Sequence, residues 1–167
     1  KMLMTDGFEE KLDVRFANRK LLDEALTHSS YFHEFPDHDI PCYERLEFLG
    51  DSIIGSIVSE ALFLKFPNQK EGYLSQQRSL IVNKKNLAHI SNELNLIKYA
   101  KIGESINFSN KSTITRINAD LYESLIGAIF LDSNYDCIRL FIYSNLLNQE
   151  YSLSKINSKG NLIELCN

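Results

Sequence analysis

The chain has 167 residues, which suits a single domain with a substantial buried core. Its composition, 44% hydrophobic and 24% charged, is that of an ordinary globular protein, and no apolar run is long enough to span a membrane. A formal net charge of −4 argues weakly against nucleic acid as a partner, because phosphate-binding surfaces normally carry an excess of Lys and Arg.

The hydrophobic pattern predicts an all-α protein. Apolar residues recur with a period near 3.6, and the chain contains only 7 Gly and 3 Pro. The predicted helices cover residues 8–16, 20–27, 43–66, 73–82, 84–94, 117–131 and 135–147. Asn83 is a credible N-cap for the fifth of these helices. Irregular loops are expected over residues 28–41 and 104–114.

Residues 1–148 are expected to form one folded domain. After Leu147 the composition becomes polar, so residues 149–157 are interpreted as a linker. Residues 158–167 have the pattern of the opening of another helix. The sequence therefore predicts one folded domain followed by a linker and the opening of another helix.

Two of the predicted helices carry pairs of acidic residues in apolar surroundings. Glu47 and Asp51 are four residues apart in the first long helix, and Asp120 and Glu123 are three apart in the second. Residues at these spacings are neighbours on one helical face. Because their flanking residues are mostly aliphatic or aromatic, the pairs are expected to be buried or half-buried, where carboxylates are costly unless a cation neutralises them. Four converging carboxylates suit hard divalent metal ions, and with them phosphodiester chemistry.

Two other interpretations of the acids are open. Most acidic pairs at helical spacing lie on solvated surfaces, although the apolar surroundings disfavour that here. A buried network with Arg45 and Arg116 would need two arginines to neutralise four acids, so metal ions are the simpler counter-charge. Gly50 and Gly127 lie in the same two helices, where each costs about 1 kcal/mol relative to Ala. Their presence predicts that the two backbones approach closely and bring the acid pairs together.

The histidines and cysteines offer no competing metal site. The four histidines are scattered without a His-Glu-x-x-His spacing, and His28 is expected to be a structural hydrogen-bonding residue. Three cysteines without a Cys-x-x-Cys pair favour free thiols in a reducing compartment over disulfides or zinc. Because the N-terminus lacks the features of a secretory signal, a cytoplasmic location is expected, with an organelle matrix as the other possibility.

The acidic stretches resemble the motifs of the ribonuclease III family, the double-strand RNA endonucleases that include Dicer and Drosha. The stretch Glu44-Arg-Leu-Glu-Phe-Leu-Gly-Asp-Ser is similar to the nine-residue signature of the family, and residues 119–132 resemble its second acidic motif. Leu26-Thr-His-Ser-Ser-Tyr and Glu71-Gly-Tyr-Leu-Ser resemble two further family elements. The resemblance covers roughly residues 8–148.

This resemblance implies an all-helical, homodimeric endonuclease domain of the ribonuclease III type that uses Mg²⁺, with Mn²⁺ as a substitute. By family position, the catalytic and metal-binding acids would be Glu47, Asp51, Asp120 and Glu123. Glu44 and Glu71 match further family acids, to which we assign secondary roles. Phe48 resembles the residue that the family inserts into a socket on the partner subunit, and ordinary core packing is the alternative.

The implied function is hydrolysis of phosphodiester bonds in double-stranded RNA during RNA processing, including that of ribosomal RNA, with 5′-phosphate products and short 3′ overhangs. The alternative is a non-catalytic double-stranded-RNA-binding or ribosome-associated scaffold of the same fold. Such relatives typically lose acids at the site, whereas this chain keeps all four. Residues 158–167 resemble the start of the double-stranded RNA-binding domain of bacterial-type members, here truncated. A basic module of that kind would balance the acidic charge of the catalytic part.

Overall fold

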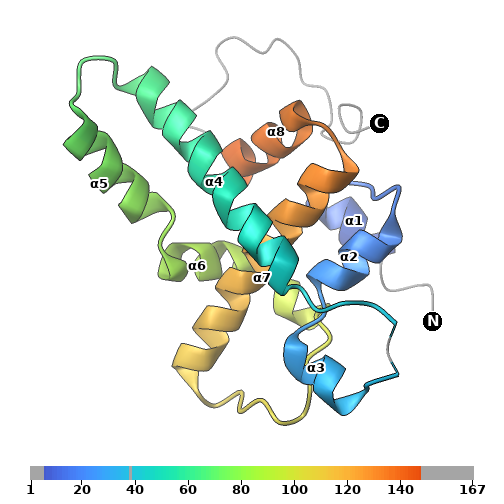
Figure 1. The fold of residues 1–167 in the computed structure, drawn as a ribbon. Helices are drawn as coiled ribbons and strands as arrows, with labels where there is room; N and C mark the ends of the chain where they lie inside the picture. The colour runs from blue at the N-terminus through green and yellow to red at the C-terminus, as the bar shows by residue number, and fades with distance from the viewer. Residues whose placement is uncertain (1–5, 38, 148–167) are drawn as a thin grey trace.

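Two long helices cross at the centre of the molecule, and the other helices pack around them (Figure 1). The structure is a computed structural model that describes residues 6–37 and 39–147. Its α-helices are α1 (Asp6–Leu12), α2 (Arg19–Ala25), α3 (Ser29–Glu34), α4 (Glu44–Lys65), α5 (Glu71–Ile81), α6 (Lys84–Leu94), α7 (Lys111–Asp132) and α8 (Tyr135–Asn145). A 3₁₀ turn, η1, spans Leu96–Lys98. Apart from a single bridge between Thr27 and Lys101, the described residues contain no β-structure, so the all-α prediction is confirmed.

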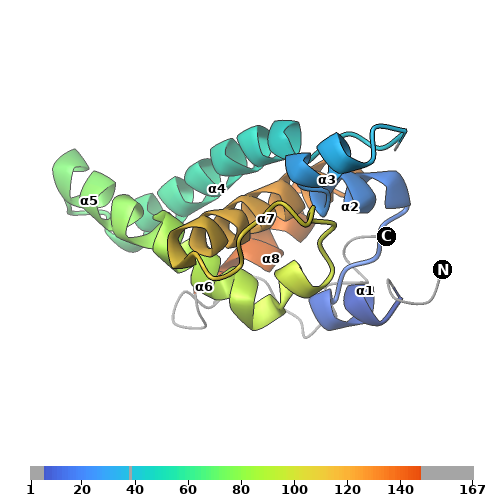
Figure 2. The same cartoon turned by 90° about the horizontal axis from the view of Figure 1, so that it is seen from below.

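Helix α7 forms the centre of the core. Every residue from 117 to 129 is buried, because α4 covers one side of the helix while α6 and α8 lie on the other (Figure 2). Polar side chains in such a position need partners inside the protein. Ser124 finds one in α2, where its hydroxyl donates to the carbonyl oxygen of Ala25 at 2.7 Å. Asp120 and Glu123 belong to the same buried stretch, so the core itself carries carboxylates.

Helices α4 and α7 each have a glycine at the point where they cross. A Cβ atom built on Gly50 would overlap the backbone carbonyl oxygen of Glu123, and one built on Gly127 would overlap that of Leu46. No other residue type fits either position without moving a backbone. The predicted close approach is therefore confirmed, and it brings the first turns of α4 directly against the middle of α7.

Asparagine side chains begin four of the helices. The N-caps of α2, α6, α7 and α8 are Asn18, Asn83, Asn110 and Asn134, and each side-chain oxygen accepts a backbone N–H of the following turn. The prediction for Asn83 is confirmed. Because Asn110 caps α7, the helix begins at Lys111, six residues before the predicted start, and the end of the expected polar loop is helical.

The segment expected to be an irregular loop over residues 28–41 contains α3. The Nδ1 atom of His28 accepts the N–H of Ser30 at 3.0 Å and lies 2.7 Å from the Ser30 hydroxyl oxygen. At the other end, the Glu34 carboxylate accepts the N–H groups of Glu104 and Ser105 at 2.9 and 3.0 Å. The loop prediction is wrong for Ser29–Glu34 because such distant contacts stabilise a helix too short to form alone. The structural role expected for His28 is confirmed.

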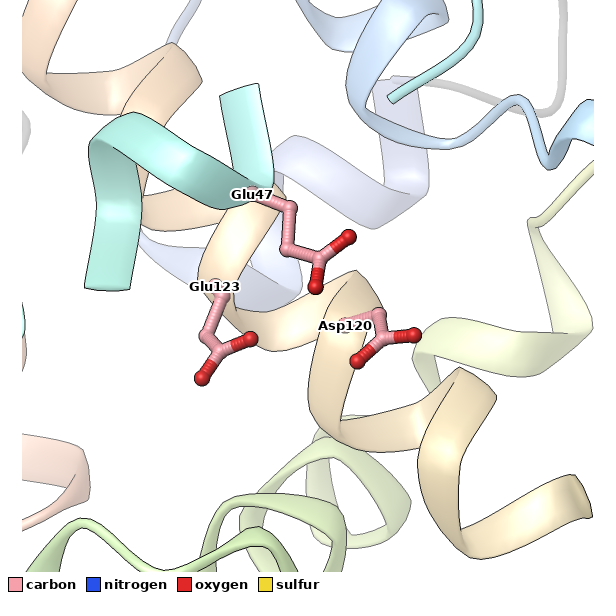
Figure 3. Close-up of side chains that lie close together, drawn as sticks. All are labelled: Glu47, Asp120 and Glu123. Carbon is pink, nitrogen blue, oxygen red and sulfur yellow. The ribbon is translucent and has the colours of Figure 1, made fainter. Parts of the chain in front are cut away.

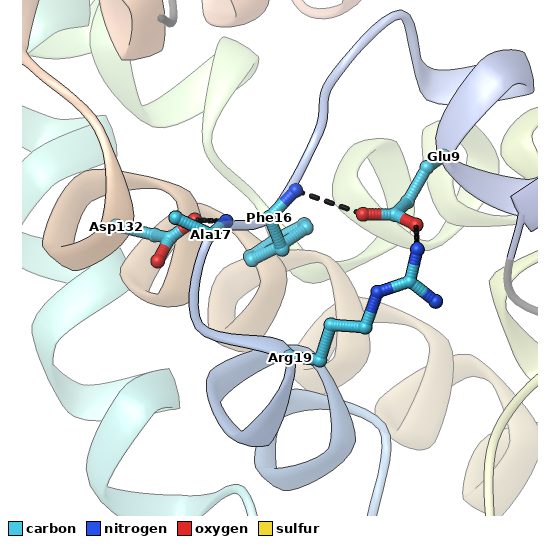
Figure 4. A network of polar contacts seen from close by, with 5 residues as sticks. All are labelled: Glu9, Phe16, Ala17, Arg19 and Asp132. Atoms are coloured by element: carbon cyan, nitrogen blue, oxygen red, sulfur yellow. Dashed lines mark hydrogen bonds and ion pairs between the residues drawn. The ribbon is translucent and has the colours of Figure 1, made fainter.

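Carboxylates also tie the N-terminal segment to α7 (Figure 4). Asp132, at the end of α7, accepts the N–H groups of Ala17 and Asn18 at 2.7 and 2.8 Å. The buried Glu9 accepts the N–H of Phe16 at 2.8 Å and forms an ion pair with Arg19 at 2.9 Å. This network fixes the start of α2 against the central helix.

The predictions about the rest of the chain have different outcomes. The linker expected over residues 149–157 and the second domain expected to start at residue 158 lie outside the described residues. Within the described residues, no helix is long and apolar enough to cross a membrane.

Cys42 is a free thiol, whereas Cys137 is disulfide-bonded. The prediction of free thiols, which rested on cysteine number and spacing alone, is therefore wrong for Cys137.

Candidate metal centre

Three carboxylates converge where α4 crosses α7 (Figure 3). Glu47 extends from α4 toward Asp120 and Glu123, which lie one turn apart on α7. One oxygen atom from each side chain lies within 4.8 Å of the others. Asp120 and Glu123 are only 7% and 5% exposed, and Glu47 is partly buried. We call these three residues the acidic trio.

Burial makes ionisation of the acidic trio unfavourable. It raises the pKa of Glu123 to about 7; Lys84 opposes the rise, and the charges of Asp51, Asp120 and Glu47 add to it. Burial and the charge of Asp120 likewise raise the pKa of Glu47. A carboxylate that holds a proton near neutral pH lies where one more cation would be strongly stabilised. The oxygen donors and their spacing suit a hard divalent ion.

One lysine reaches the acidic trio. Lys84, the first residue of α6, forms an ion pair with Asp120, with 2.8 Å between Nζ and Oδ1. Neither Arg45 nor Arg116 forms an ion pair with the trio in the described part of the chain, so the arginine network considered from sequence is absent there. A single ammonium group cannot neutralise three carboxylates. Sequence reasoning missed Lys84, because nothing distinguishes it from its neighbour Lys85.

Asp51 occupies a different position from the other three predicted acids. It lies one turn after Glu47 on α4, but it is exposed and is not part of the converging group. Its charge still acts on Glu123, which places it within electrostatic range at the rim of the site. The burial expected for all four acids is thus found for three of them. The apolar pattern around Asp51 predicted a buried helix face, but no other part of the described chain covers Asp51.

The two secondary acids are also exposed. Glu44 begins α4 and lines a surface pocket beside Phe48. Glu71 begins α5, where it accepts a hydrogen bond from the Ser75 hydroxyl at 2.6 Å. Neither residue belongs to the acidic trio. Their secondary roles therefore stay predictions.

Phe48 lies on the outer side of α4. Its side chain is 78% exposed, so it does not pack in the core of this chain. It borders a pocket of about 660 Å³ whose apolar walls include Leu21, Leu49 and Leu131. An exposed aromatic ring beside an apolar pocket is typical of a contact surface.

The fold and the trio define an all-helical protein with a carboxylate site suited to divalent cations. A family model described as ribonuclease-III-like matches residues 18–150, and the chain belongs to that family. The prediction made from the sequence motifs is confirmed. "Ribonuclease 3" of Clostridium tetani is 40% identical over 140 residues, which are 84% of this chain and 59% of the relative. "Ribonuclease 3" of Borreliella burgdorferi is 40% identical over 135 residues, 81% of this chain and 55% of the relative.

Solved structures agree with this assignment. The nuclease domain of ribonuclease III from Campylobacter jejuni, at 31% identity, covers 93% of this chain and 100% of that domain with a TM-score of 0.76. Dicer from Pichia stipitis is 26% identical, with 77% of this chain and 53% of that chain covered and a TM-score of 0.55. This chain spans less than two thirds of the length of the curated relatives named above.

Proposed function

We propose that this chain is the catalytic part of an endoribonuclease that hydrolyses phosphodiester bonds in double-stranded RNA. The observation that carries the proposal is the convergence of Glu47, Asp120 and Glu123 within 4.8 Å at a largely buried site. Family membership and the curated relatives named "Ribonuclease 3" support the reaction class. The proposed products carry 5′-phosphates and short 3′ overhangs, as the family resemblance implies.

The proposed cofactor is Mg²⁺, with Mn²⁺ as a substitute. The residues fit such an ion because the donors are all carboxylate oxygens. Among the described residues, Lys84 alone forms an ion pair with them, which leaves the site negatively charged. When bound, the ion would supply Lewis acidity and an activated water for in-line attack on the phosphodiester. The buried helix α7 holds Asp120 and Glu123 in fixed positions, and Glu47 closes the site from α4. Asp51 completes the proposed set from the rim.

The proposed assembly is a homodimer formed through the face of α4 that carries Phe48. A second structure of the Campylobacter jejuni nuclease domain, 34% identical with a TM-score of 0.72 and covering 84% of this chain and 96% of that one, was described for flexibility in a region involved in dimer formation. The exposed ring of Phe48 and its adjacent pocket suit such a contact. A two-fold dimer presents two sites to the two antiparallel strands of a duplex, which produces staggered cuts.

Recognition of the duplex is proposed to depend on shape. A-form RNA exposes a wide minor groove lined by 2′-hydroxyl groups, and a rigid helical surface can follow it without reading sequence. Because the chain is acidic overall, dimerisation or a basic companion module would strengthen this binding. The proposed role is RNA processing in the cytoplasm or in an organelle matrix.

Cleavage of labelled duplex RNA tests the proposal. The full chain should cut the duplex in Mg²⁺ at low ionic strength and leave single-stranded RNA intact, and EDTA should stop the reaction. Glu123→Gln should reduce the rate at least 100-fold without changing the circular dichroism spectrum. A wild-type protein that binds the duplex but never cuts it would instead support the non-catalytic scaffold. Full activity of Glu123→Gln would refute the site assignment.

A further inference from the structure

Lys84 places an ammonium group against the acidic trio from the solvent side. Its side chain is 55% exposed, whereas that of Asp120, 2.8 Å away, is 9% exposed. The backbone of Lys84 is fixed because Asn83 caps α6 immediately before it, with the Asn83 side-chain oxygen accepting the N–H of Asn86 at 3.0 Å. The lysine is thus anchored at one end and paired with a buried carboxylate at the other.

The charge of Lys84 acts on the whole trio. One oxygen atom each of Glu47, Asp120 and Glu123 lies within 4.8 Å of the others, so an ammonium group 2.8 Å from Asp120 attracts all three carboxylates. A lysine side chain that is half exposed and paired with a carboxylate carries its charge at neutral pH. Lys84 is therefore a permanent positive charge in the space where a divalent ion would be stabilised.

The adjacent lysine provides a contrast within the same turn of helix. Lys85 is exposed, and its side chain forms no ion pair with any described residue. The two lysines have the same charge and almost the same backbone position. Their difference is that only Lys84 contacts Asp120, so any specific electrostatic effect on the site belongs to Lys84.

We propose that Lys84 is a tethered counter-ion that occupies the acidic trio before a divalent ion does and competes with that ion for Asp120. The inference rests on the proposed function, because it assumes that the trio binds a divalent cation. An Asp120 oxygen that accepts the ammonium hydrogen bond has one lone pair fewer for a metal ion. In addition, two cations a few ångströms apart repel each other strongly in partly buried surroundings. Lys84 must therefore move or share Asp120 when the metal ion enters.

This arrangement has opposite effects with and without the metal ion. In the metal-free protein, Lys84 offsets the repulsion among Glu47, Asp120 and Glu123 and so stabilises the crossing of α4 and α7. When a divalent ion is present, the same charge weakens its binding. Lys84 thus acts as a positioning residue that keeps the three carboxylates together in the metal-free protein and limits their affinity for the metal ion.

Titration of Mn²⁺ into the metal-free full chain, followed by calorimetry, tests the proposal without any RNA. Lys84→Gln should bind Mn²⁺ about tenfold more tightly than wild type, a gain of about 1.4 kcal/mol. Lys85→Gln, which removes the same charge one residue away, should keep the wild-type affinity. Lys84→Arg, which retains the charge, should also stay close to wild type.

Thermal melting supplies the second measurement. Without metal ions, Lys84→Gln should melt at a lower temperature than Lys85→Gln, and saturating Mn²⁺ should remove most of that difference. Equal Mn²⁺ affinities for the two variants, or weaker binding by Lys84→Gln, would overturn the counter-ion role while leaving the proposed function intact. If the wild type binds no Mn²⁺ at all, the metal-dependent function itself is refuted and this inference with it.

Discussion

The backbone carbonyl oxygen of Glu123 lies against Gly50, in the space that the Cβ of any larger residue would fill. This contact is made at the point where α4 and α7 cross, one turn from the side chain of Glu47. The position of Glu47 relative to Asp120 and Glu123 therefore depends on the absence of a side chain at Gly50.

Replacement of Gly50 by Ala should separate the two helices. Because the new methyl group meets backbone atoms rather than a mobile side chain, we expect a loss of about 3 kcal/mol in the free energy of unfolding. The Mn²⁺ affinity should fall with it, since α7 carries Asp120 and Glu123 away from Glu47. Urea denaturation and calorimetry measure the two effects.

Gly55→Ala is the matched control on the same helix. A Cβ at Gly55 has nothing within 4 Å, so the substitution should stabilise the protein by about 0.5–1 kcal/mol through helix propensity. If both substitutions have the same small effect, the close approach of the helices does not determine the site.

Much of this architecture could be predicted from the sequence because it follows from local patterns. The spacing of apolar residues predicts α4, and Gly50 and Gly127 predict the helix crossing. Helix α3 was missed because its stability comes from contacts such as those of Glu34 with Glu104 and Ser105, which no local pattern encodes.

The site was predicted less completely than the fold. The acid types and their helical spacing were sufficient to place Glu47, Asp120 and Glu123 together. The exposure of Asp51 and the ion pair of Lys84 depend on which surfaces neighbouring helices cover and on a contact between residues 36 positions apart. Those are properties of the packed structure rather than of any local motif.

Phe48→Ala should weaken association of two chains while leaving each chain stable. The ring is 78% exposed in the single chain, so its loss should change the unfolding free energy of the monomer by less than about 0.5 kcal/mol. An aromatic side chain at the centre of an interface commonly contributes about 2 kcal/mol or more to binding. Sedimentation equilibrium should show at least a tenfold weaker dimer.

Phe108→Ala serves as the comparison for that measurement. Phe108 is also well exposed, at 56%, but it lies in the loop before α7 rather than on α4. It should leave the association unchanged. Equal association for wild type and Phe48→Ala would show that the dimer contact lies elsewhere.

Tyr122→Phe should stabilise the protein. Tyr122 is fully buried, and its hydroxyl group has no hydrogen-bond partner among the described residues. Removing an unsatisfied buried hydroxyl relieves a desolvation penalty of about 1–3 kcal/mol. Ser124→Ala should act in the opposite direction, because it removes the hydrogen bond to Ala25. Destabilisation by Tyr122→Phe, measured by urea denaturation, would instead reveal a bonded hydroxyl.

The stability of the metal-free protein should fall as the pH rises from about 4.5 to about 7. Burial raises the pKa of Glu123 from 4.5 to about 7, so the folded state binds a proton that the unfolded state has already released. The stabilisation is complete below the unfolded pKa and is lost as the pH passes through the folded pKa. Its size is about 3 kcal/mol.

Glu123→Gln isolates this contribution, because the amide has similar volume and does not titrate. In EDTA, the difference in melting temperature between wild type and Glu123→Gln should therefore change across the same pH range, with the wild type losing stability relative to the variant. At pH 7.5, saturating Mg²⁺ should raise the melting temperature of the wild type much more than that of Glu123→Gln, because the ion supplies the positive charge that neutralises the ionised carboxylate. A pH-independent difference would mean that Glu123 is solvated and carries its charge without cost.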